Sequence, residues 1–267
     1  MPEGDTIWRL SERLQPLVGR VITHSDFRIA PLATASLTGE RIDRIWPYGK
    51  HLYWQCGERI LHTHLLMDGE WRIHSMGRRW SKPAHTARLV VHVDGVELVG
   101  HDLGVVELWP AQQYGQRTAH LGPDLLAPEW ADTGRDEAIA RIVSHPGRTI
   151  GEALLDQRNL AGIGNEYSAE VCFLKGLHPA APVSACDVPA VVDQAAKLMR
   201  DNRHRVKRTF TGDERENTFV FGRRHRPCRR CGTTIESSTL GGATSVADPE
   251  AGRERIIWWC PACQPLS

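Results

Sequence analysis

The chain has 267 residues, of which 41% are hydrophobic and 24% charged, so it is long enough for more than one domain with a sizeable core. No apolar run approaches the ~18–20 residues of a membrane-spanning helix, and charged residues interrupt the N-terminal segment where a signal peptide would be apolar. We therefore expect a cytoplasmic protein with no membrane partner.

The net charge of +1 conceals an uneven distribution. Residues 197–231 contain twelve Lys/Arg and four Asp/Glu, a net charge of +8, so the rest of the chain is acidic. A basic segment on a mildly acidic chain is typical of polyanion binding. A solvated charged face explains the same pattern equally well.

The chain begins with Met1-Pro2-Glu3-Gly4-Asp5. If Met1 is removed, Pro2 becomes a free secondary amine, and α-amino groups titrate near ~7.7–8 rather than near the ~10.4 of lysine. Attack of such an amine on an aldehyde gives an iminium ion, which withdraws electrons. Glu3 is an adjacent candidate proton carrier. Proline also suits a helix start, and these residues alone favour that structural interpretation.

The first ~120 residues predict one helix followed by antiparallel strands. Apolar residues at helical spacing from Ile7 to Leu17 predict the helix, with Asp5 or Thr6 as its cap. Asp94-Gly95 lies between two β-rich runs and predicts a two-residue hairpin turn. Strands are indicated by short, partly alternating segments at 21–22, 41–46, 51–54, 60–65, 70–73, 89–93, 96–99 and 105–109.

The pattern becomes helical after residue 122. Helices are predicted at 138–143, 149–155, 165–175 and 189–205. The linker before the third helix contains Gly162 and Gly164, which permit a sharp turn, and Asn165 is a candidate N-cap. A helix N-terminus after glycines presents N–H groups to an anion such as phosphate. An ordinary capped helix–turn–helix has the same pattern.

Two C-x2-C pairs lie near the C-terminal end, formed by Cys228, Cys231, Cys260 and Cys263. Each pair can turn both thiolates toward one metal ion, and zinc is the best match for four sulfurs. An iron–sulfur cluster and a pair of disulfides are the weaker alternatives. The 28-residue gap between the pairs predicts a long hairpin. The other cysteines are scattered and expected to be buried free thiols: Cys56, Cys172 and Cys186.

Four motifs in this order carry a resemblance to a known family. They are Pro2-Glu3-Gly4, Tyr-Gly-Lys-His-Leu at 48–52, the 155–165 segment from Leu-Asp-Gln to Gly-Ile-Gly-Asn, and the C-terminal cysteine pairs. Together they resemble the formamidopyrimidine-DNA glycosylase / endonuclease VIII family of base-excision repair enzymes. The Pro-Glu-Gly start is closer to the endonuclease VIII branch, which acts on oxidised pyrimidines.

The resemblance covers the whole chain and implies an α+β fold. Residues 1–121 would form an N-terminal helix plus an antiparallel β-sandwich, and 122–217 a helical domain with a helix–two-turn–helix. Residues 218–267 would form a β-hairpin zinc finger. The resemblance implies damaged DNA as the partner, a monomer associated with the nucleoid, one structural Zn2+ and no small-molecule cofactor.

The resemblance also implies catalytic roles. Pro2 would attack C1′ of the lesion sugar, displace the base and form the iminium, and Glu3 would shuttle protons as the sugar ring opens. Lys50 would assist elimination and contact phosphate, although a lysine at a hairpin tip is otherwise a solvated turn residue. Asp5 and Thr6 stand where many relatives have Pro-Glu, so a second carboxylate role is not carried over to Thr6.

Further residues would hold the DNA. Asn165 would bind phosphate at its helix N-terminus, and Arg255 in the finger hairpin would bind phosphate in the manner of a family arginine. Arg253 is the alternative in register, because the hairpin looks longer than usual at 241–252. His120 stands where endonuclease VIII relatives offer an arginine to DNA.

The segment from His64 to Gly69 places Leu66 and Met67 near a turn, matching the family's intercalating loop. Apolar side chains inserted between base steps can fill the space of an extruded base. The alternative is that both are core residues. Two competing functions remain open: the same fold acting on oxidised purines, and a non-catalytic zinc-ribbon DNA-binding protein.

Overall fold

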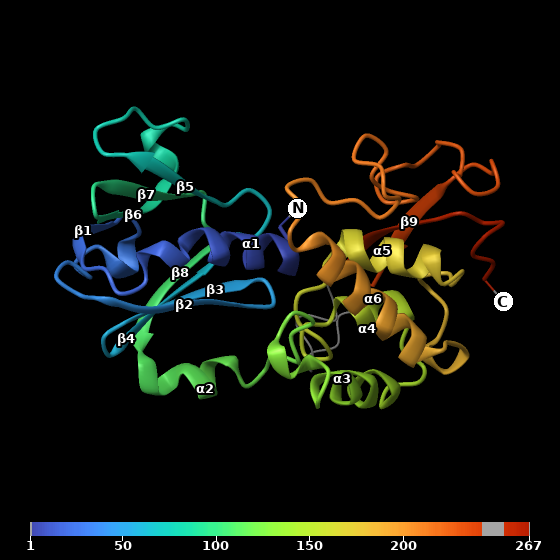
Figure 1. The fold of residues 1–267 in the computed structure, drawn as a ribbon. Coiled ribbons are helices and arrows are strands. Elements are labelled where there is room, and N and C mark those ends of the chain that lie inside the picture. Colours follow the sequence, from blue (N-terminus) through green and yellow to red (C-terminus); the bar gives the residue numbers. More distant parts are fainter. Residues whose placement is uncertain (1, 242–253, 267) are drawn as a thin grey trace. The chain divides into compact units, whose positions relative to one another are not determined.

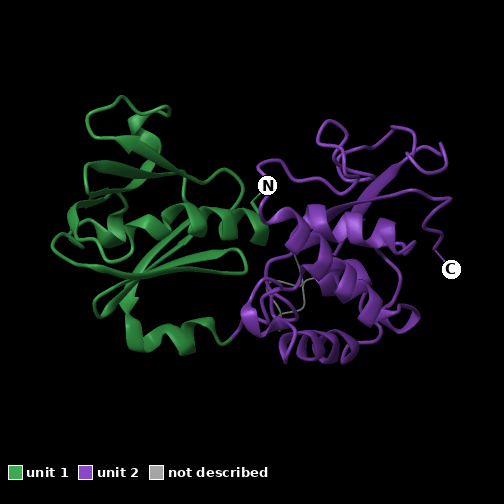
Figure 2. Ribbon diagram, in the orientation of Figure 1, with its two compact units in different colours: residues 1–119 green, residues 120–267 purple. Residues whose placement is uncertain are grey.

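The computed structural model describes residues 2–241 and 254–266 (Figure 1). The chain forms two compact units, residues 1–119 and 120–267 (Figure 2). The helical segment and the cysteine-containing segment therefore share one unit, and the predicted boundary between them at 217 stays a prediction. Arg253 and most of the lengthened hairpin segment lie outside the described residues.

Helix α1 (Gly4–Leu14) opens the first unit and continues into a short 3-10 turn. Its N-cap is Glu3, so the prediction of Asp5 or Thr6 as the cap was wrong, because the helix starts earlier than the apolar periodicity indicates. Ile7, Leu10 and Leu14 are buried, and α1 packs against β2 and β3. The helix thereby fixes the position of the residues that precede it.

Two four-stranded antiparallel sheets follow, with strand orders β1-β6-β7-β5 and β2-β3-β4-β8 (Figure 1). All eight predicted strands are present. Trp54 and Trp71, one from each sheet, stack in the shared core with ring centroids 5.4 Å apart. The strands are β1 (Ile22–Phe27), β2 (Ile42–Tyr48), β3 (His51–Cys56), β4 (Arg59–His64), β5 (Glu70–Ser75), β6 (Ala87–Val93), β7 (Val96–His101) and β8 (Val105–Pro110).

Helices dominate the second unit, and their buried faces form its own core. The predicted helices are confirmed as α3 (Gly134–Val143), α4 (Ile150–Leu155), α5 (Asn165–Leu174) and α6 (Val188–Asn202). The strands β9 (Glu236–Leu240) and β10 (Arg255–Trp259) pair antiparallel. The α+β fold, with antiparallel sheets and a C-terminal helical part, is as predicted.

Short elements complete the description. Helix α2 (Tyr114–Thr118) belongs to the first unit. Short 3-10 turns occupy Gln15–Leu17, Ala30–Leu32, Ala84–Thr86, Ala111–Gln113, Pro128–Trp130 and Val183–Ala185. Among the described residues, no helix combines the length and the apolar character that crossing a membrane requires.

Candidate functional site

Pro2 and Glu3 lie directly before the first turn of α1. Pro2 is half-buried, and the Glu3 side chain is fully buried. The Glu3 carbonyl accepts hydrogen bonds from the backbone N–H groups of Thr6 (2.9 Å) and Ile7 (3.2 Å). A carboxylate at a helix N-terminus is stabilised by the helix dipole. The start of α1 therefore holds an acid next to the residue whose nitrogen would be the nucleophile.

Asp5 is also fully buried in this first turn. Its Oδ1 accepts from the Thr6 N–H at 2.8 Å, and Oδ2 lies 3.7 Å from Arg9 Nη1. A buried carboxylate is costly unless it is hydrogen-bonded or paired. Asp5 has such partners, so the first turn of α1 carries a second buried acid.

Lys50 lies at the tip of the β2–β3 hairpin and is half-buried. Gly49 has φ of 56°, the left-handed conformation that lets two strands turn tightly. Tyr48 and His51 pair across the strands on either side of the turn. The ladder therefore holds the Lys50 backbone in a fixed place within the same unit as Pro2 and Glu3.

The segment from Leu65 to Gly69 presents two apolar side chains to solvent. Leu66 is 50% exposed and Met67 is 61% exposed, so the alternative that both are core residues was wrong. Leu66 has φ of 53°, and its side chain lies against Gly104, where an added Cβ would come within 2.2 Å of Leu66 Cδ1. Backbone bonds from Gly69 N–H to the Leu65 carbonyl (3.0 Å) and from Gly104 N–H to the His64 carbonyl (3.0 Å) hold the base of this loop.

Asn165 and the β10 strand meet in the second unit. Asn165 is the first residue of α5, and Gly164 is the N-cap, so the prediction that Asn165 caps the helix was wrong. Its Nδ2 instead donates to the Ile256 carbonyl at 2.9 Å. Ile256 follows Arg255, which is exposed at the start of β10. Asn165 and Arg255 thus lie close together, although 90 residues separate them in the sequence.

Two further DNA contacts were predicted, His120 and Arg253. His120 is exposed at the beginning of the second unit. Arg253 lies outside the described residues, so its register relative to Arg255 stays a prediction.

The four sulfurs of Cys228, Cys231, Cys260 and Cys263 all lie within 4.8 Å of one another. The Cys231 sulfur is 3.5 Å from both the Cys260 and the Cys263 sulfur, and Cys228 to Cys263 is 4.0 Å. A tetrahedral ion with four ~2.3 Å metal–sulfur bonds requires sulfur separations of about 3.8 Å. Hydrogen bonds from Thr233 lower the pKa of Cys231 to about 6, which favours a thiolate. The cluster therefore fits one four-coordinate metal ion, and the cysteines are free thiols, not disulfides.

Two residues that the sequence analysis missed attach this cysteine cluster to the helices. Glu170 of α5 is fully buried and accepts from the backbone N–H groups of Phe219, Val220 and Phe221 at 2.8–2.9 Å. Burial raises the pKa of Glu170 to about 7, and these three donors oppose that shift. Buried Gln264 accepts from the Cys260 N–H at 2.9 Å and donates to the Leu177 carbonyl at 2.7 Å. The partners of Glu170 and the Leu177 partner of Gln264 are distant in sequence, so no local pattern signals these bonds.

A buried acid, Asp156, is the C-cap of α4. Asp156 accepts hydrogen bonds from Arg158 Nη2 at 2.7 Å and Arg148 Nη1 at 2.6 Å. Burial alone would raise the pKa of Asp156, but the bonds from Arg158 and Arg148 outweigh it and bring the pKa down to about 2. The next residue, Gln157, donates to the Ile163 carbonyl and accepts from Gly162 N–H, which fixes the glycine linker before α5.

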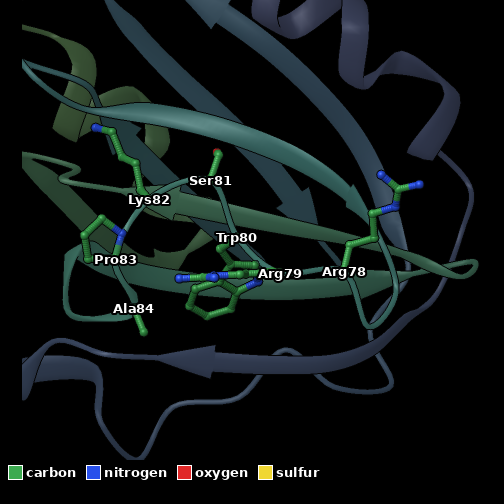
Figure 3. Close-up of a pocket in the computed structure, with 7 residues that line it drawn as sticks. All are labelled: Arg78, Arg79, Trp80, Ser81, Lys82, Pro83 and Ala84. Carbon is green, nitrogen blue, oxygen red and sulfur yellow. The ribbon is translucent and has the colours of Figure 1, made fainter.

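A surface pocket lies on the segment between β5 and β6, and none of the predicted site residues lines it (Figure 3). Lys82 is paired with Asp102 at 3.0 Å and Glu70 at 3.3 Å, and Trp80 donates to Glu97. The lining residues are Arg78, Arg79, Trp80, Ser81, Lys82, Pro83 and Ala84. The lysine of this pocket is thus paired to acids.

Comparison with known proteins gives matches along the whole chain. Residues 1–104 match the formamidopyrimidine-DNA glycosylase N-terminal domain, and 121–210 match the formamidopyrimidine-DNA glycosylase H2TH domain. The chain is 43% identical to a protein of Streptomyces coelicolor named probable endonuclease 8 2, over 99% of this chain and 94% of that protein. It is 38% identical to a Mycolicibacterium smegmatis protein named DNA-(apurinic or apyrimidinic site) lyase Nei2, over the full length of both.

A solved structure shares the fold. The formamidopyrimidine-DNA glycosylase of Lactococcus lactis, bound to DNA containing an abasic site, superimposes with a TM-score of 0.79. The two sequences are 22% identical, and the match covers 98% of this chain and 99% of that one. At this identity the likeness shows the fold alone.

Proposed function

The chain belongs to the formamidopyrimidine-DNA glycosylase and endonuclease 8 family of DNA-repair glycosylase–lyases, and on that premise we propose that it removes oxidised pyrimidines through an iminium on Pro2. The observation that carries this proposal is the start of α1, where Pro2 directly precedes the fully buried acid Glu3. The name endonuclease 8 among the whole-chain relatives favours the pyrimidine branch over oxidised purines.

The chemistry uses the groups of this N-terminal site. The Pro2 nitrogen attacks C1′, the bond from C1′ to the base breaks, and Glu3 gives a proton to the sugar ring oxygen as the ring opens. The resulting iminium withdraws electrons from C2′, so the C2′ proton is lost and the 3′ phosphate leaves with the C3′–O electron pair. Loss of the 5′ phosphate follows in the same way, and water then releases Pro2 by hydrolysing the iminium.

The DNA would be held by groups from both units. Lys50 on its hairpin turn, and Asn165 with Arg255 beside it, would bind phosphates, and exposed His120 would add a contact. Leu66 and Met67 would fill the stack that the extruded base leaves, since they are apolar and exposed. The enzyme would act on DNA of the nucleoid as a monomer, without a small-molecule cofactor.

The four-cysteine cluster would hold one Zn2+, because four thiolates at this spacing suit zinc best. Four protein ligands close the coordination shell, so the ion would be structural and would stabilise the hairpin that carries Arg255.

Borohydride trapping on an oligonucleotide with an abasic site tests the proposal. Reduction should fix a covalent adduct that mass mapping assigns to Pro2, and protein with an uncleaved N-terminal tag should form none. An adduct on Lys50 would mean that the protein is a lyase whose nucleophile is Lys50 and not Pro2. If protein that lacks Met1 forms no adduct, the chain is a DNA-binding protein without this chemistry.

A second experiment compares substrates. Excision of thymine glycol should be faster than excision of 8-oxoguanine opposite cytosine. The reverse order would show that the chain prefers oxidised purines.

A further inference from the structure

The face of the β2-β3-β4-β8 sheet that lies opposite the core carries a row of polar and aromatic side chains. Alternate residues of β3 are buried in the core, so His51 and Tyr53 lie on the other face. The strand register places His51 beside His64, and it places Tyr53, His62 and Glu107 side by side across β3, β4 and β8. Three histidines and a carboxylate therefore share one surface of the sheet.

Two hydrogen bonds join three of these groups into a chain. Nδ1 of His62 lies 2.9 Å from Glu107 Oε2, and Nε2 of His62 lies 2.9 Å from Nδ1 of His51. An ionised carboxylate only accepts, so Nδ1 of His62 donates to Glu107. When His62 is neutral, its Nε2 accepts from His51. When His62 is an imidazolium, Nε2 donates instead, and the His51 proton sits on Nε2. One added proton thus reverses the second bond and changes the tautomer of His51.

The chain begins at a partly exposed carboxylate and passes through a buried histidine to half-buried His51. The Glu107 side chain is 46% exposed and lies 3.9 Å from Arg117 Nη1, whereas the His62 side chain is only 11% exposed. His62 stacks on Tyr53 with centroids 4.9 Å apart, and Trp109 lies beside it. Hydrogen bonds are stronger electrostatically in such a poorly solvated layer than in water. The Glu107 side chain reaches solvent and can therefore exchange protons with water.

The His51 end lies near two of the proposed DNA contacts. His51 directly follows Lys50, and its ring packs edge-on against His64 with centroids 4.8 Å apart. Nδ1 of His64 accepts from the N–H of Leu66 at 2.9 Å, which places the His64 proton on Nε2. Burial first, and then the charges of Lys50 and His62, lower the pKa of His64 to about 4, so His64 is neutral at pH 7. The chain therefore ends between the Lys50 turn and the Leu66–Met67 loop.

We propose that His51, His62 and Glu107 form a proton relay that carries the proton released by β-elimination from the Lys50 turn to solvent. The proposal rests on the proposed lyase function. In that step the C2′–H bond breaks, its electron pair forms the enamine, and the C3′–O pair leaves with the 3′ phosphate. The proton passes from the Lys50 turn to Nε2 of His51. The His51 Nδ1 proton then moves to His62, and the His62 Nδ1 proton moves through Glu107 to water. No oxidant or metal takes part.

The charges around His62 decide when the relay works. Glu107 stabilises the imidazolium form of His62, whereas Lys50, Arg117 and a protonated His51 or His64 oppose it; Tyr53 contributes no charge at neutral pH. Elimination needs a neutral His62 that can accept a proton. Replacing Glu107 by an uncharged amide makes His62 a weaker proton acceptor, so the rate at pH 7 falls and the acidic limb of the pH profile moves to lower pH.

The test measures single-turnover strand cleavage at an abasic site against pH for wild type, Glu107→Gln and His62→Gln. We expect both variants to cleave about tenfold more slowly at pH 7, with unchanged affinity for the abasic DNA and an unchanged yield of borohydride-trapped adduct. His92→Gln is the matched control. In the other sheet His92 also bonds a carboxylate, with Nε2 3.0 Å from Glu97 Oε1, and this variant should behave as wild type.

Two outcomes separate the relay from the lyase itself. If wild type traps on Pro2 but Glu107→Gln and His62→Gln keep the wild-type rate and pH profile, the relay is wrong and the lyase stands. If wild type forms no adduct, the proposed function fails and the relay fails with it.

Imidazole 15N spectra of the free protein give a readout without DNA. They should show a protonated Nδ1 on His62 and titration at lower pH in Glu107→Gln; an unshifted titration overturns the relay.

Discussion

At the scale of single residues, Asp156 stabilises the fold through charge. Arginine bonds depress its pKa to about 2. A carboxyl with a depressed folded pKa stabilises the protein above its unfolded pKa, and that contribution disappears as the pH falls through the folded pKa. We expect Asp156→Asn to lower the free energy of unfolding at pH 7 by about 2 kcal/mol. Below pH ~4 the difference from wild type should shrink.

Denaturant unfolding of both proteins at pH 7 and pH 3 measures this difference. Asp193→Asn is the control, because Asp193 forms a comparable bond to Arg135 at 2.6 Å but is 52% exposed. Exposed ion pairs contribute little, so this variant should stay within about 1 kcal/mol of wild type at either pH. A loss for Asp156→Asn that is equal at both pH values would show that packing, rather than charge, is responsible.

The sequence predicted the placement of single residues only where their partners are close in sequence. The cysteine spacing predicted the sulfur cluster, and the position of Leu66 and Met67 near a turn predicted apolar tips. Glu170 could not be found in this way, because its partners lie about fifty residues downstream. The Asn165 side chain likewise bonds a strand that sequence proximity does not place beside it.

At the scale of elements, the cysteine cluster should hold its hairpin through the metal. Cys228→Ser removes one of four ligands, so we expect loss of the bound metal, a lower melting temperature and weaker DNA binding together. Mass spectrometry under native conditions measures metal content, and Cys186→Ser is the control, since Cys186 is a free thiol outside the cluster. Full metal content in Cys228→Ser would refute the site.

The Leu66–Met67 loop makes a separate prediction. Met67→Ala shortens an exposed apolar side chain, so we expect about tenfold slower excision of a paired oxidised base. Extruding the base costs a few kcal/mol, and a tenfold loss of rate corresponds to about 1.4 kcal/mol. Cleavage at a preformed abasic site should change much less. Met76→Ala is the control, as Met76 is 48% exposed on a different loop. Equal losses on both substrates would assign Met67 another role.

Strands and turns could be predicted from sequence where buried and exposed residues alternate along the chain. The Asp94-Gly95 turn has φ of 46° and 79°, as a two-residue hairpin turn requires. The first strand is longer than predicted, because the polar residues of β1 are ordered by pairing with β6. Helix α6 ends at Asn202, before the predicted 205, since the Asn202 side chain bonds both the N–H and the carbonyl of Thr209.

At the scale of the molecule, the basic segment belongs wholly to the second unit. Arg255 lies in that unit and would bind a phosphate, so we expect Arg255→Ala to weaken binding to all DNA sequences and to reduce the slope of log affinity against log salt by about 1. Fluorescence anisotropy at several salt concentrations measures both quantities. Arg141→Ala is the control, because Arg141 is already bonded to Glu137 within α3. An unchanged slope for Arg255→Ala would remove Arg255 from the phosphate contacts.

The division into two units was less accessible from sequence than the elements were. The change from alternating to helical periodicity near residue 122 indicates where the first unit ends, and the structure places that boundary at 119. Periodicity could not show that the cysteine hairpin joins the helical core, because that union depends on the long-range bonds of Glu170 and Gln264.

The glycines beneath the Leu66–Met67 loop, Gly69 and Gly104, determine which positions of the loop can accept other side chains. Side chains at Gly104 or Gly69 would collide with Leu66 and with the Leu65 carbonyl, whereas the Met67 side chain is 61% exposed. Substitution is therefore sterically restricted at the two glycines and much less so at Met67. The side chain at position 67 can therefore be exchanged while the backbone that presents it stays the same.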